Sequence, residues 1–298
     1  MHRELAAVVH ELKRLRRQGV DAIPISDETL AQLRQRFPIR PRAERAPVEA
    51  AASPSAAASA GLPAPARKQI AVKPKDPAPE IPTPPAVELK GADKAAQWEA
   101  LRQQVLDDPF CRSQLKPGKN LVFGVGSLDA EIFFCGEAPG AEEEEQSEPF
   151  VGPAGQLLTK IIQAMGLSRD QVYIGNIMNF RPPMPTPIGN RPPTAEEMAY
   201  CLPYLTGQVK IVQPKVIVAL GKTAVDGLLG PDPKRRMGQV RGQWQAFQGI
   251  PLMPTYHPSY LLRNDSMKAK RMVWEDILLA MDKVGLPISE KQRAYFKS

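Results

Sequence analysis

Residues 215–220 read Lys215-Val-Ile-Val-Ala-Leu220, and Gly221 follows them directly. Apart from the lysine, every side chain in this stretch is apolar, and Val and Ile are residues that favour β-strands. A short strand that is apolar on both faces is typical of a parallel sheet whose two faces are covered by helices. The stretch therefore predicts a central strand of an α/β domain.

Three further apolar segments predict strands, and segments with helical spacing separate them along the chain. The strand segments are 131–135, 171–177 and 250–255. Helices are expected from near Ala154, over 194–212, after Gly221 and over 267–284, with Thr194 as an N-cap and Glu197 three residues later. This order predicts an α/β fold, a three-layer α/β/α domain with a mainly parallel four-stranded central sheet.

Composition divides the chain into three parts. Residues 92–298 have the apolar runs and turns of a globular domain, enough for one core. Residues 39–91 are rich in Pro and Ala and predict a disordered linker, because they cannot bury enough apolar surface to offset the entropy of ordering. Residues 1–38 predict two short amphipathic helices, which either dock a protein partner or form a weakly ordered tail.

The overall charge and the cysteines restrict the class of protein. A net charge of +7 and a pI of about 9.3 fit a nucleic-acid partner, but fit an ordinary solvated surface equally well. Three scattered cysteines do not form a disulfide framework and indicate a reducing compartment. The first residues lack the apolar core of a secretion signal, and no apolar run is long enough for a membrane helix. We expect a cytoplasmic monomer without a membrane partner.

The unusual residues cluster where the predicted strands end. Gly136-Glu137-Ala138-Pro139-Gly140 follows the first strand, and Asn176, Gly221 and His257 end or follow the other three. In parallel sheets of this kind, ligands bind beyond the carboxyl ends of the strands. The sequence therefore predicts a site at this edge before it indicates any chemistry.

The loop after the first strand does not have the pattern of a phosphate-binding loop. It contains neither Gly-Lys-Ser/Thr nor Gly-x-Gly-x-x-Gly, and its carboxylates would repel a polyphosphate. Its glycines and prolines favour a tight turn over a helix, so we expect residues 142–145 to form a solvated acidic turn. Glu137 differs, because it follows a buried strand almost directly and should point into the crevice.

Three long motifs in the right order resemble one known family. They are the loop from Gly136 continued by Pro149-Phe-Val-Gly152 and Ala154-Gly-Gln-Leu-Leu158, then Asn176 with Arg181-Pro-Pro183, then Tyr256 to Arg263. From roughly residue 97 to 284 the chain resembles the iron–sulphur-type (family 4) uracil-DNA glycosylases. The resemblance implies a uracil-DNA glycosylase-like fold and a monofunctional enzyme that starts base excision repair. The implied partner is DNA containing uracil.

Each motif residue has a role that suits uracil excision. Phe150 would stack on a flipped base, and the Asn176 amide matches the O4/N3 edge of uracil. His257 would donate to O2 of the leaving uracil anion, while the resemblance makes Glu137 the carboxylate that positions water or stabilises the sugar cation. By the same resemblance Glu143 crowds the C5 position and excludes thymine. The rest of the substrate loop is Gly136, Ala138, Pro139 and Gly140.

The last motif predicts the contact with DNA. Its residues Pro258, Ser259, Tyr260, Leu261, Leu262 and Arg263 would form a loop that enters the space left by the flipped base, or a helix start that packs on the core. Candidate phosphate contacts are Arg181, Arg191, Lys222 and Arg241.

The chain departs from the family at the cluster. The family holds a four-iron cluster with four cysteines, whereas here Phe180 precedes the Arg-Pro-Pro and only Cys201 matches a ligand position. We therefore expect no metal and no cofactor, with Phe180 and Phe110 filling the volume. The segment 184–189 also lengthens a loop near the expected DNA face.

Other functions remain open at this point. The lesion could be another deaminated base, such as hypoxanthine or xanthine. A catalytically inactive DNA-binding repair scaffold is the alternative from a different class, although decay would not preserve Glu137, Phe150, Asn176 and His257 together. A nucleotide-binding metabolic enzyme is disfavoured by the missing phosphate loop.

Overall fold

The structure is a computed structural model that describes residues 81–184 and 189–296. The expected N-terminal helices over residues 1–38 and the expected linker up to residue 80 lie outside this part. Residues 81–91, which composition assigns to the linker, run without regular secondary structure, and Ile81, Val87 and Leu89 pack against the core. The folded part therefore begins earlier than residue 92.

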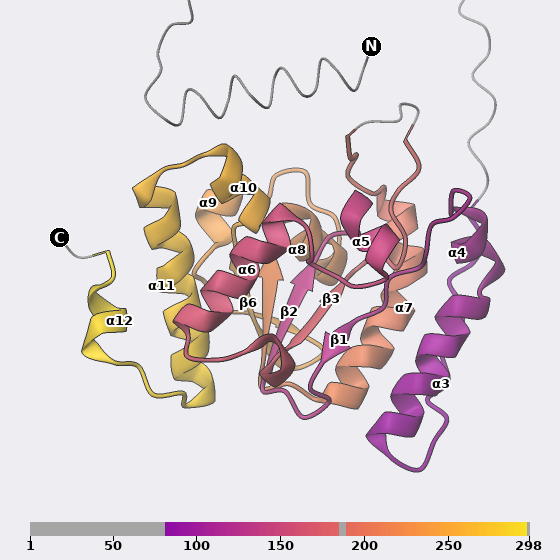
Figure 1. The fold of residues 1–298 in the computed structure, drawn as a ribbon, viewed down its shortest axis with the longest axis horizontal. Helices are drawn as coiled ribbons and strands as arrows, with labels where there is room; N and C mark the ends of the chain where they lie inside the picture. The colour runs from indigo at the N-terminus through magenta and orange to yellow at the C-terminus, as the bar shows by residue number, and fades with distance from the viewer. Residues whose placement is uncertain (1–80, 185–188, 297–298) are drawn as a thin grey trace, which may run out of the picture. The chain divides into compact units, whose positions relative to one another are not determined.

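The described chain forms one sheet with helices on both faces (Figure 1). Its strands are β1 (Val125–Gly126), β2 (Ile132–Gly136), β3 (Tyr173–Asn176), β4 (Val216–Leu220), β5 (Gln245–Phe247) and β6 (Ile250–Thr255). Its helices are α3 (Lys94–Asp107), α4 (Pro109–Ser113), α5 (Ala141–Gln146), α6 (Pro153–Ala164), η1 (Arg169–Gln171), α7 (Ala195–Val212), α8 (Lys222–Leu229), α9 (Met237–Val240), α10 (Pro258–Arg263), α11 (Met267–Val284) and α12 (Glu290–Ala294). None of these helices combines the length and apolar character needed to cross a membrane.

The sheet has six strands in the order β1-β3-β2-β4-β6-β5. The four inner strands are parallel, as the sequence predicts, with Gly136 beside Asn176 and Leu220 beside Thr255 at their carboxyl ends. The expected count of four was incomplete, because β1 and β5 add antiparallel edges. Both edge strands are only two or three residues long, too short for a periodic apolar pattern to identify them.

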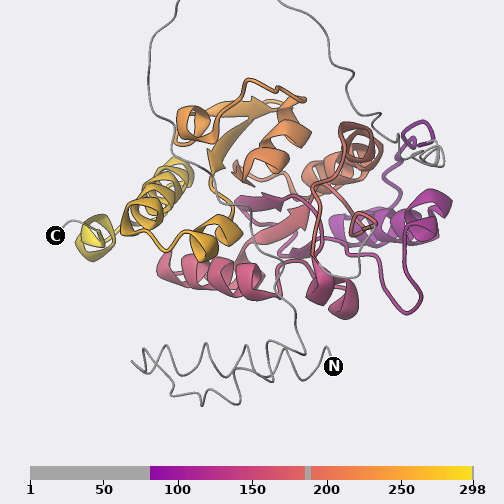
Figure 2. The same ribbon diagram turned by 90° about the horizontal axis from the view of Figure 1, so that it is seen from above.

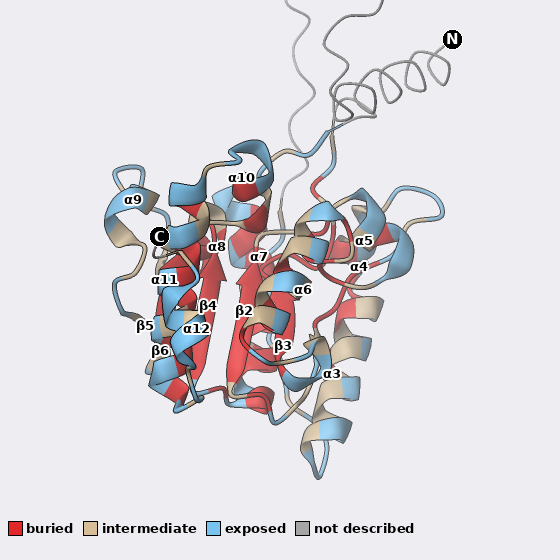
Figure 3. Cartoon of the chain, turned by 60° about the vertical axis from the view of Figure 1, so that its left-hand side comes forward, coloured by how far each residue is buried: buried red, intermediate tan, exposed pale blue. Residues whose placement is uncertain are grey.

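Alternate side chains of the inner strands enter two separate cores. On β2, Phe133 and Cys135 face the core covered by α3, α7 and α8, whereas Ile132 and Phe134 face the core covered by α6 and α11. Figure 2 shows helices on both faces from above, and Figure 3 shows the strands as the most buried layer. This confirms the three-layer α/β/α prediction.

The acidic stretch after β2 was wrongly expected to be a solvated turn. Residues 141–146 form the short helix α5, with Gly140 as its N-cap and glutamates in its first turn, where a helix N-terminus favours negative charge. Within it Glu144 is buried and pairs with Arg181 at 2.9 Å. Charge composition alone did not reveal that one of the four carboxylates has an arginine partner far along the chain.

A buried ion pair fixes the end of β6. Asp276 on α11 has no exposed surface, and its carboxylate accepts hydrogen bonds from Arg241 and from the Thr255 hydroxyl at 2.7 Å. Arg241 also donates to the carbonyl of Met272 at 2.6 Å. Burial raises the pKa of Asp276 above its ordinary value, and the hydrogen bonds from Arg241 and Thr255 offset only part of this rise. Helix α11 is thus tied to the strand that leads into Tyr256 and His257.

Replacing Asp276 by Ala should lower the free energy of unfolding by about 3–5 kcal/mol, because it leaves the Arg241 guanidinium buried without its partner. The neighbouring Glu275 provides a matched control, since it is half-exposed and pairs with Arg271 on the same helix. Glu275→Ala should change the stability by about 0–1 kcal/mol. Urea unfolding of the three proteins measures both values. Equal losses in the two variants would contradict the role given to the Asp276 pair.

Candidate active site

A cleft of about 770 Å³ lies at the carboxyl ends of the inner strands. Each of those strands contributes a lining residue at or just beyond its end: Glu137 after β2, Asn176 on β3, Gly221 after β4 and His257 after β6. Of the residues that the sequence predicts for the site, the cleft is lined by Glu137, Ala138, Pro139, Gly140, Glu143, Phe150, Asn176, His257, Ser259, Tyr260 and Arg263. Gly136, Pro258, Leu261 and Leu262 are not part of the lining.

Gly136 acts by leaving room for two of these side chains. A Cβ atom there would lie 2.3 Å from Oδ1 of Asn176 and 2.5 Å from Cζ of Phe150. The amide of Asn176 and the ring of Phe150 therefore meet over a position where only glycine fits. Asn176 is 7% exposed, and no described residue forms a hydrogen bond with its side-chain amide. A nearly buried amide without a protein partner is suited to pair with a ligand.

His257 is held as a neutral hydrogen-bond donor. Its Nδ1 accepts the backbone N–H of Ser259 at 3.1 Å and lies 2.8 Å from the Ser259 hydroxyl. Because a backbone N–H can only donate, Nδ1 is unprotonated and the ring proton sits on Nε2. Burial, followed by the charge of Arg263, lowers the pKa of His257 from 6.5 to about 4. Its ring centroid lies 5.7 Å from that of Phe150.

Glu137 lies where the loop leaves β2. Burial raises the pKa of its carboxyl group above the ordinary value, while a hydrogen bond from Thr223 and the charge of Arg263 lower it. Thr223 itself lines the cleft from the first turn of α8. Sequence reasoning missed Thr223, although its place two residues after Gly221, just past the end of β4, was a usable signal.

Glu143 points its carboxylate at the backbone of the Phe150 loop. Oε1 accepts the amide protons of Val151 at 3.0 Å and Gly152 at 2.9 Å, and Oε2 accepts that of Gly140 at 3.0 Å. Glu143 also lines the cleft. Its predicted contact with C5 of a base stays a prediction. Its three backbone contacts were not visible in the sequence.

The last motif forms helix α10, and burial separates its residues. Leu261 is 4% exposed and packs in the core beneath α6 and α11, whereas Leu262 is 50% exposed. Pro258 is buried as well. The expectation that Leu261 contacts DNA is therefore not supported, since its side chain is used for packing. Leu262 is the leucine left at the surface.

Two of the four candidate phosphate contacts are occupied by carboxylates inside the protein. Arg181 pairs with buried Glu144, and Arg241 pairs with buried Asp276, so we correct both assignments to structural ion pairs. Arg191 lines the cleft but forms a two-pronged pair with Glu197. Lys222 also lines the cleft, pairs with Asp226 and stays partly exposed.

Two cysteine thiols meet between α4 and α7, at the place where the resemblance implies a metal cluster. Sequence reasoning assigned only Cys201 to this place, but the structure places the Cys111 thiol close enough to Cys201 for the two groups to affect each other's ionisation. The interaction with Cys201, followed by burial, raises the pKa of Cys111 far above its ordinary value. The third thiol, Cys135, is buried within β2.

The surroundings of the two thiols do not fit a four-thiolate cluster. Asp108 accepts hydrogen bonds from the hydroxyls of Tyr200 at 2.8 Å and Tyr204 at 2.7 Å, and from the amide of Cys111 at 2.7 Å. Phe110 packs on Tyr200 and edge-on to Phe180, with centroid distances of 4.4 and 5.9 Å. Within the described ranges no three His, Cys, Asp or Glu side chains are grouped as a metal site would need. Fewer than four thiols are present in the whole chain.

The fold and the cleft define an α/β protein that can bind a planar, polar ring between an aromatic face and a side-chain amide. Comparison with known proteins gives this class a name. The family model of the uracil DNA glycosylase superfamily matches residues 123–278. A type-4 uracil-DNA glycosylase of Thermotoga maritima is 47% identical over 165 residues, which cover 53% of this chain and 80% of that relative.

Two further relatives agree with this match. Type-4 uracil-DNA glycosylases of Pyrobaculum aerophilum and Saccharolobus solfataricus are 39% and 40% identical, over 160 and 157 residues. The aligned parts cover 51% and 50% of this chain, and 78% and 70% of those relatives. The chain belongs to the uracil-DNA glycosylase superfamily, whose members are hydrolytic glycosylases of DNA repair.

The low pKa of His257 should make the stability depend on pH. Between the unfolded pKa of 6.5 and the folded pKa of about 4, the unfolded chain binds a proton that the folded chain does not. The stability that neutral His257 contributes to the folded protein is therefore complete above pH 6.5 and is lost as the pH falls toward 4. At about pH 4.5 the wild-type protein should have lost roughly 2–3 kcal/mol from this source.

The variant His257→Gln isolates that contribution. Its free energy of unfolding should fall less than that of the wild type between about pH 7.5 and pH 4.5, by the same roughly 2–3 kcal/mol. Other titrating groups affect both proteins alike and cancel in the comparison. Urea unfolding at the two pH values provides the measurement, and parallel pH dependence in both proteins would show that His257 is not held neutral.

Proposed function

We propose that this protein removes uracil from DNA by hydrolysing the N-glycosidic bond of a nucleotide that has been flipped out of the helix. The observation that carries the proposal is the amide of Asn176, which has no hydrogen-bond partner among the described residues and shares its cleft with the ring of Phe150 and the neutral imidazole of His257. The similarity to type-4 uracil-DNA glycosylases supports the same substrate.

Recognition of the base depends on Phe150 and Asn176. The ring offers an aromatic face on which a flipped base stacks. The Asn176 amide carries one acceptor and two donors, so it can accept N3–H of uracil while it donates to O4. Cytosine presents the opposite pattern at these two positions, which leaves buried groups of the amide unpaired and costs binding energy.

The bond-breaking step depends on His257 and Glu137. When the glycosidic bond breaks, negative charge develops on O2 of uracil, and the Nε2–H of His257 is a donor held in place for it. The sugar develops positive charge, and the Glu137 carboxylate faces it or orders the attacking water. Arg263 lies near both groups and influences the pKa of each.

Replacing either polar group should reduce uracil release sharply. Loss of a single preorganised donor costs on the order of 100- to 1000-fold in rate, so we expect losses of that size for His257→Ala and Asn176→Ala. The measurement is base release from an oligonucleotide with one uracil, scored by alkaline strand scission after a single turnover. Oligonucleotides with thymine or hypoxanthine serve as controls.

The outcomes of this assay separate the candidate functions. Release of uracil alone supports the proposal, and release of hypoxanthine alone would move the substrate to a purine. DNA binding without any base release would favour a repair scaffold. Near-wild-type rates in both variants would show that the cleft is not the active site.

We also propose that the activity needs no iron–sulphur cluster, because the Asp108–Tyr200–Tyr204 hydrogen bonds and the ring of Phe180 take up that part of the core. Protein produced with iron and sulphide in excess should contain less than about 0.1 iron per chain, since fewer than four thiolates are available. Its rate of uracil release should not change after treatment with an iron chelator. Stoichiometric iron, or loss of activity on chelation, would overturn this proposal.

A further inference from the structure

The backbone at Phe150 has an unusual conformation. Its φ is 57°, in the left-handed region that side chains other than Gly, Asn and Asp rarely adopt. This conformation brings the Phe150 carbonyl so close to α6 that a Cβ on Gly155 would lie 1.8 Å from the oxygen. Phe150 is 6% exposed, and its ring meets Asn176 over Gly136. Such strain persists only where surrounding contacts enforce it.

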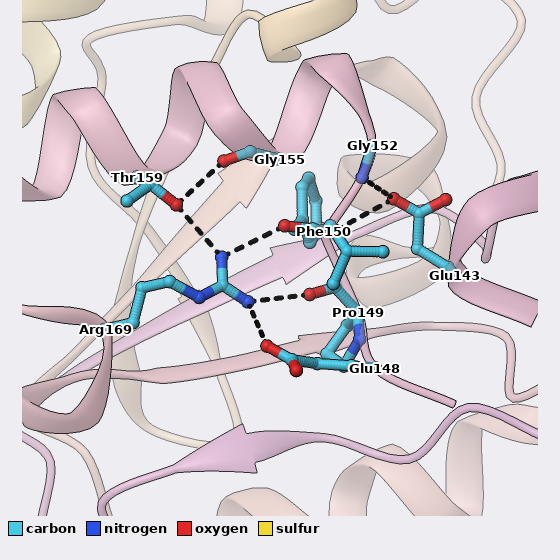
Figure 4. Close-up of polar contacts among 9 residues, drawn as sticks. Glu143, Glu148, Pro149, Phe150, Gly152, Gly155, Thr159 and Arg169 are labelled. Carbon is cyan, nitrogen blue, oxygen red and sulfur yellow. Dashed lines mark hydrogen bonds and ion pairs between the residues drawn. The ribbon is translucent and has the colours of Figure 1, made fainter. Parts of the chain in front are cut away.

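Arg169 contacts the carbonyl side of this segment. From η1, its guanidinium donates to the carbonyl of Pro149 at 2.8 Å and to that of Phe150 at 3.1 Å (Figure 4). The same group contacts the Glu148 carboxylate at 3.0 Å and the Thr159 hydroxyl at 3.3 Å. A planar guanidinium with several fixed donors can hold two successive carbonyls in one orientation.

Glu143 contacts the amide side of the same segment. Its Oε1 accepts the N–H groups of Val151 and Gly152, which directly follow Phe150. In Figure 4, Arg169 and Glu143 lie on opposite sides of residues 149–152. The positively charged side chain of Arg169 therefore binds the carbonyls of Pro149 and Phe150, and the negatively charged side chain of Glu143 binds the amides that follow Phe150.

We infer that Arg169 and Glu143 are positioning residues that hold Phe150 in its left-handed conformation, so that its ring is in place before the base arrives. The inference rests on the proposed function, in which Phe150 is the surface that the base stacks on. Without these contacts the backbone relaxes toward negative φ, and the ring leaves its place beside Asn176. A base that stacks on a displaced ring no longer meets Asn176 and His257 in the geometry for bond cleavage.

The variant Arg169→Gln tests the inference. Because small displacements of reacting groups cost up to about 100-fold in rate, we expect a 10- to 100-fold lower single-turnover rate of uracil release. The reaction amplitude, which reports the folded fraction, and the affinity for DNA with an abasic site should stay near wild type. Arg169→Lys retains a charged donor and should recover part of the rate.

Arg235 supplies a matched control. It also pairs with a carboxylate, that of Asp226, and donates to a carbonyl, that of Gly230 at 2.9 Å, but it does not line the cleft. Arg235→Gln removes the same kind of contacts and should leave the rate constant of the folded fraction unchanged. An equal fall in rate for both variants would mean that loss of a structural arginine in general, and not the Phe150 segment, is responsible.

A double-mutant cycle identifies the residue through which Arg169 acts. In a Phe150→Ala background there is no ring to position, so Arg169→Gln should cause no further loss in rate. Glu143→Gln should behave in the same way, which guards against poor folding of one variant. If Arg169→Gln lowers the rate by the same factor with and without Phe150, the inference is wrong.

Hydrogen exchange gives a test that does not depend on catalysis. The amides of Val151 and Gly152 should exchange faster in Arg169→Gln than in the wild type and in Arg235→Gln, because the segment opens more often. If the wild type released no uracil but these amides still lost protection, the proposed function would fail and the positioning role would stand. Unchanged protection in Arg169→Gln would overturn the positioning role, whatever the activity of the wild type.

Discussion

The site depends on the missing side chain at Gly136. This residue ends β2 beside Asn176 on β3, and any Cβ there would collide with both the Asn176 amide and the Phe150 ring. The two groups that would read a base come from different parts of the chain and can meet only over a bare backbone. The parallel sheet brings the strand ends together, and the glycine lets the side chains approach.

Further contacts, made outside the pair of Asn176 and Phe150, hold the side chains of the cleft in position. Asp276 ties α11 to Thr255, next to the Tyr256-His257 segment, and the backbone N–H of Ser259 fixes the tautomer of His257. Arg169 and Glu143 bind the backbone around Phe150. These groups are charged or polar and sit in partly buried places, where hydrogen bonds between well-placed partners are stronger than in water. The geometry of the cleft is therefore set largely by residues other than Asn176 and Phe150, the pair that would recognise the base.

The difference between features set by local sequence and contacts between distant residues explains how much the sequence could predict. The four parallel strands, the capping of α7 by Thr194 and the convergence of Glu137, Asn176 and His257 follow from local patterns and from the rule for strand ends. Pairings between distant residues could not be predicted in this way. Glu144 with Arg181, Asp276 with Arg241 and Cys111 with Cys201 are separated by 37, 35 and 90 positions, and no local pattern marks a charged residue as buried. Arg169 was missed for the same reason, since it lies 19 positions from Phe150.

The neutral state of His257 also follows from its surroundings. An imidazolium would be a stronger donor to a uracil anion, but it would have to carry a proton on Nδ1, where the Ser259 N–H already donates, and it would lie near the charge of Arg263. A neutral donor avoids both conflicts and needs no proton uptake before the reaction. Arg263 is exposed at the cleft, and in the proposed reaction its positive charge faces a phosphate of DNA. In the proposed reaction, hydrogen bonding to the base and attraction of the DNA backbone thus fall to different residues of the same short helix and its cap.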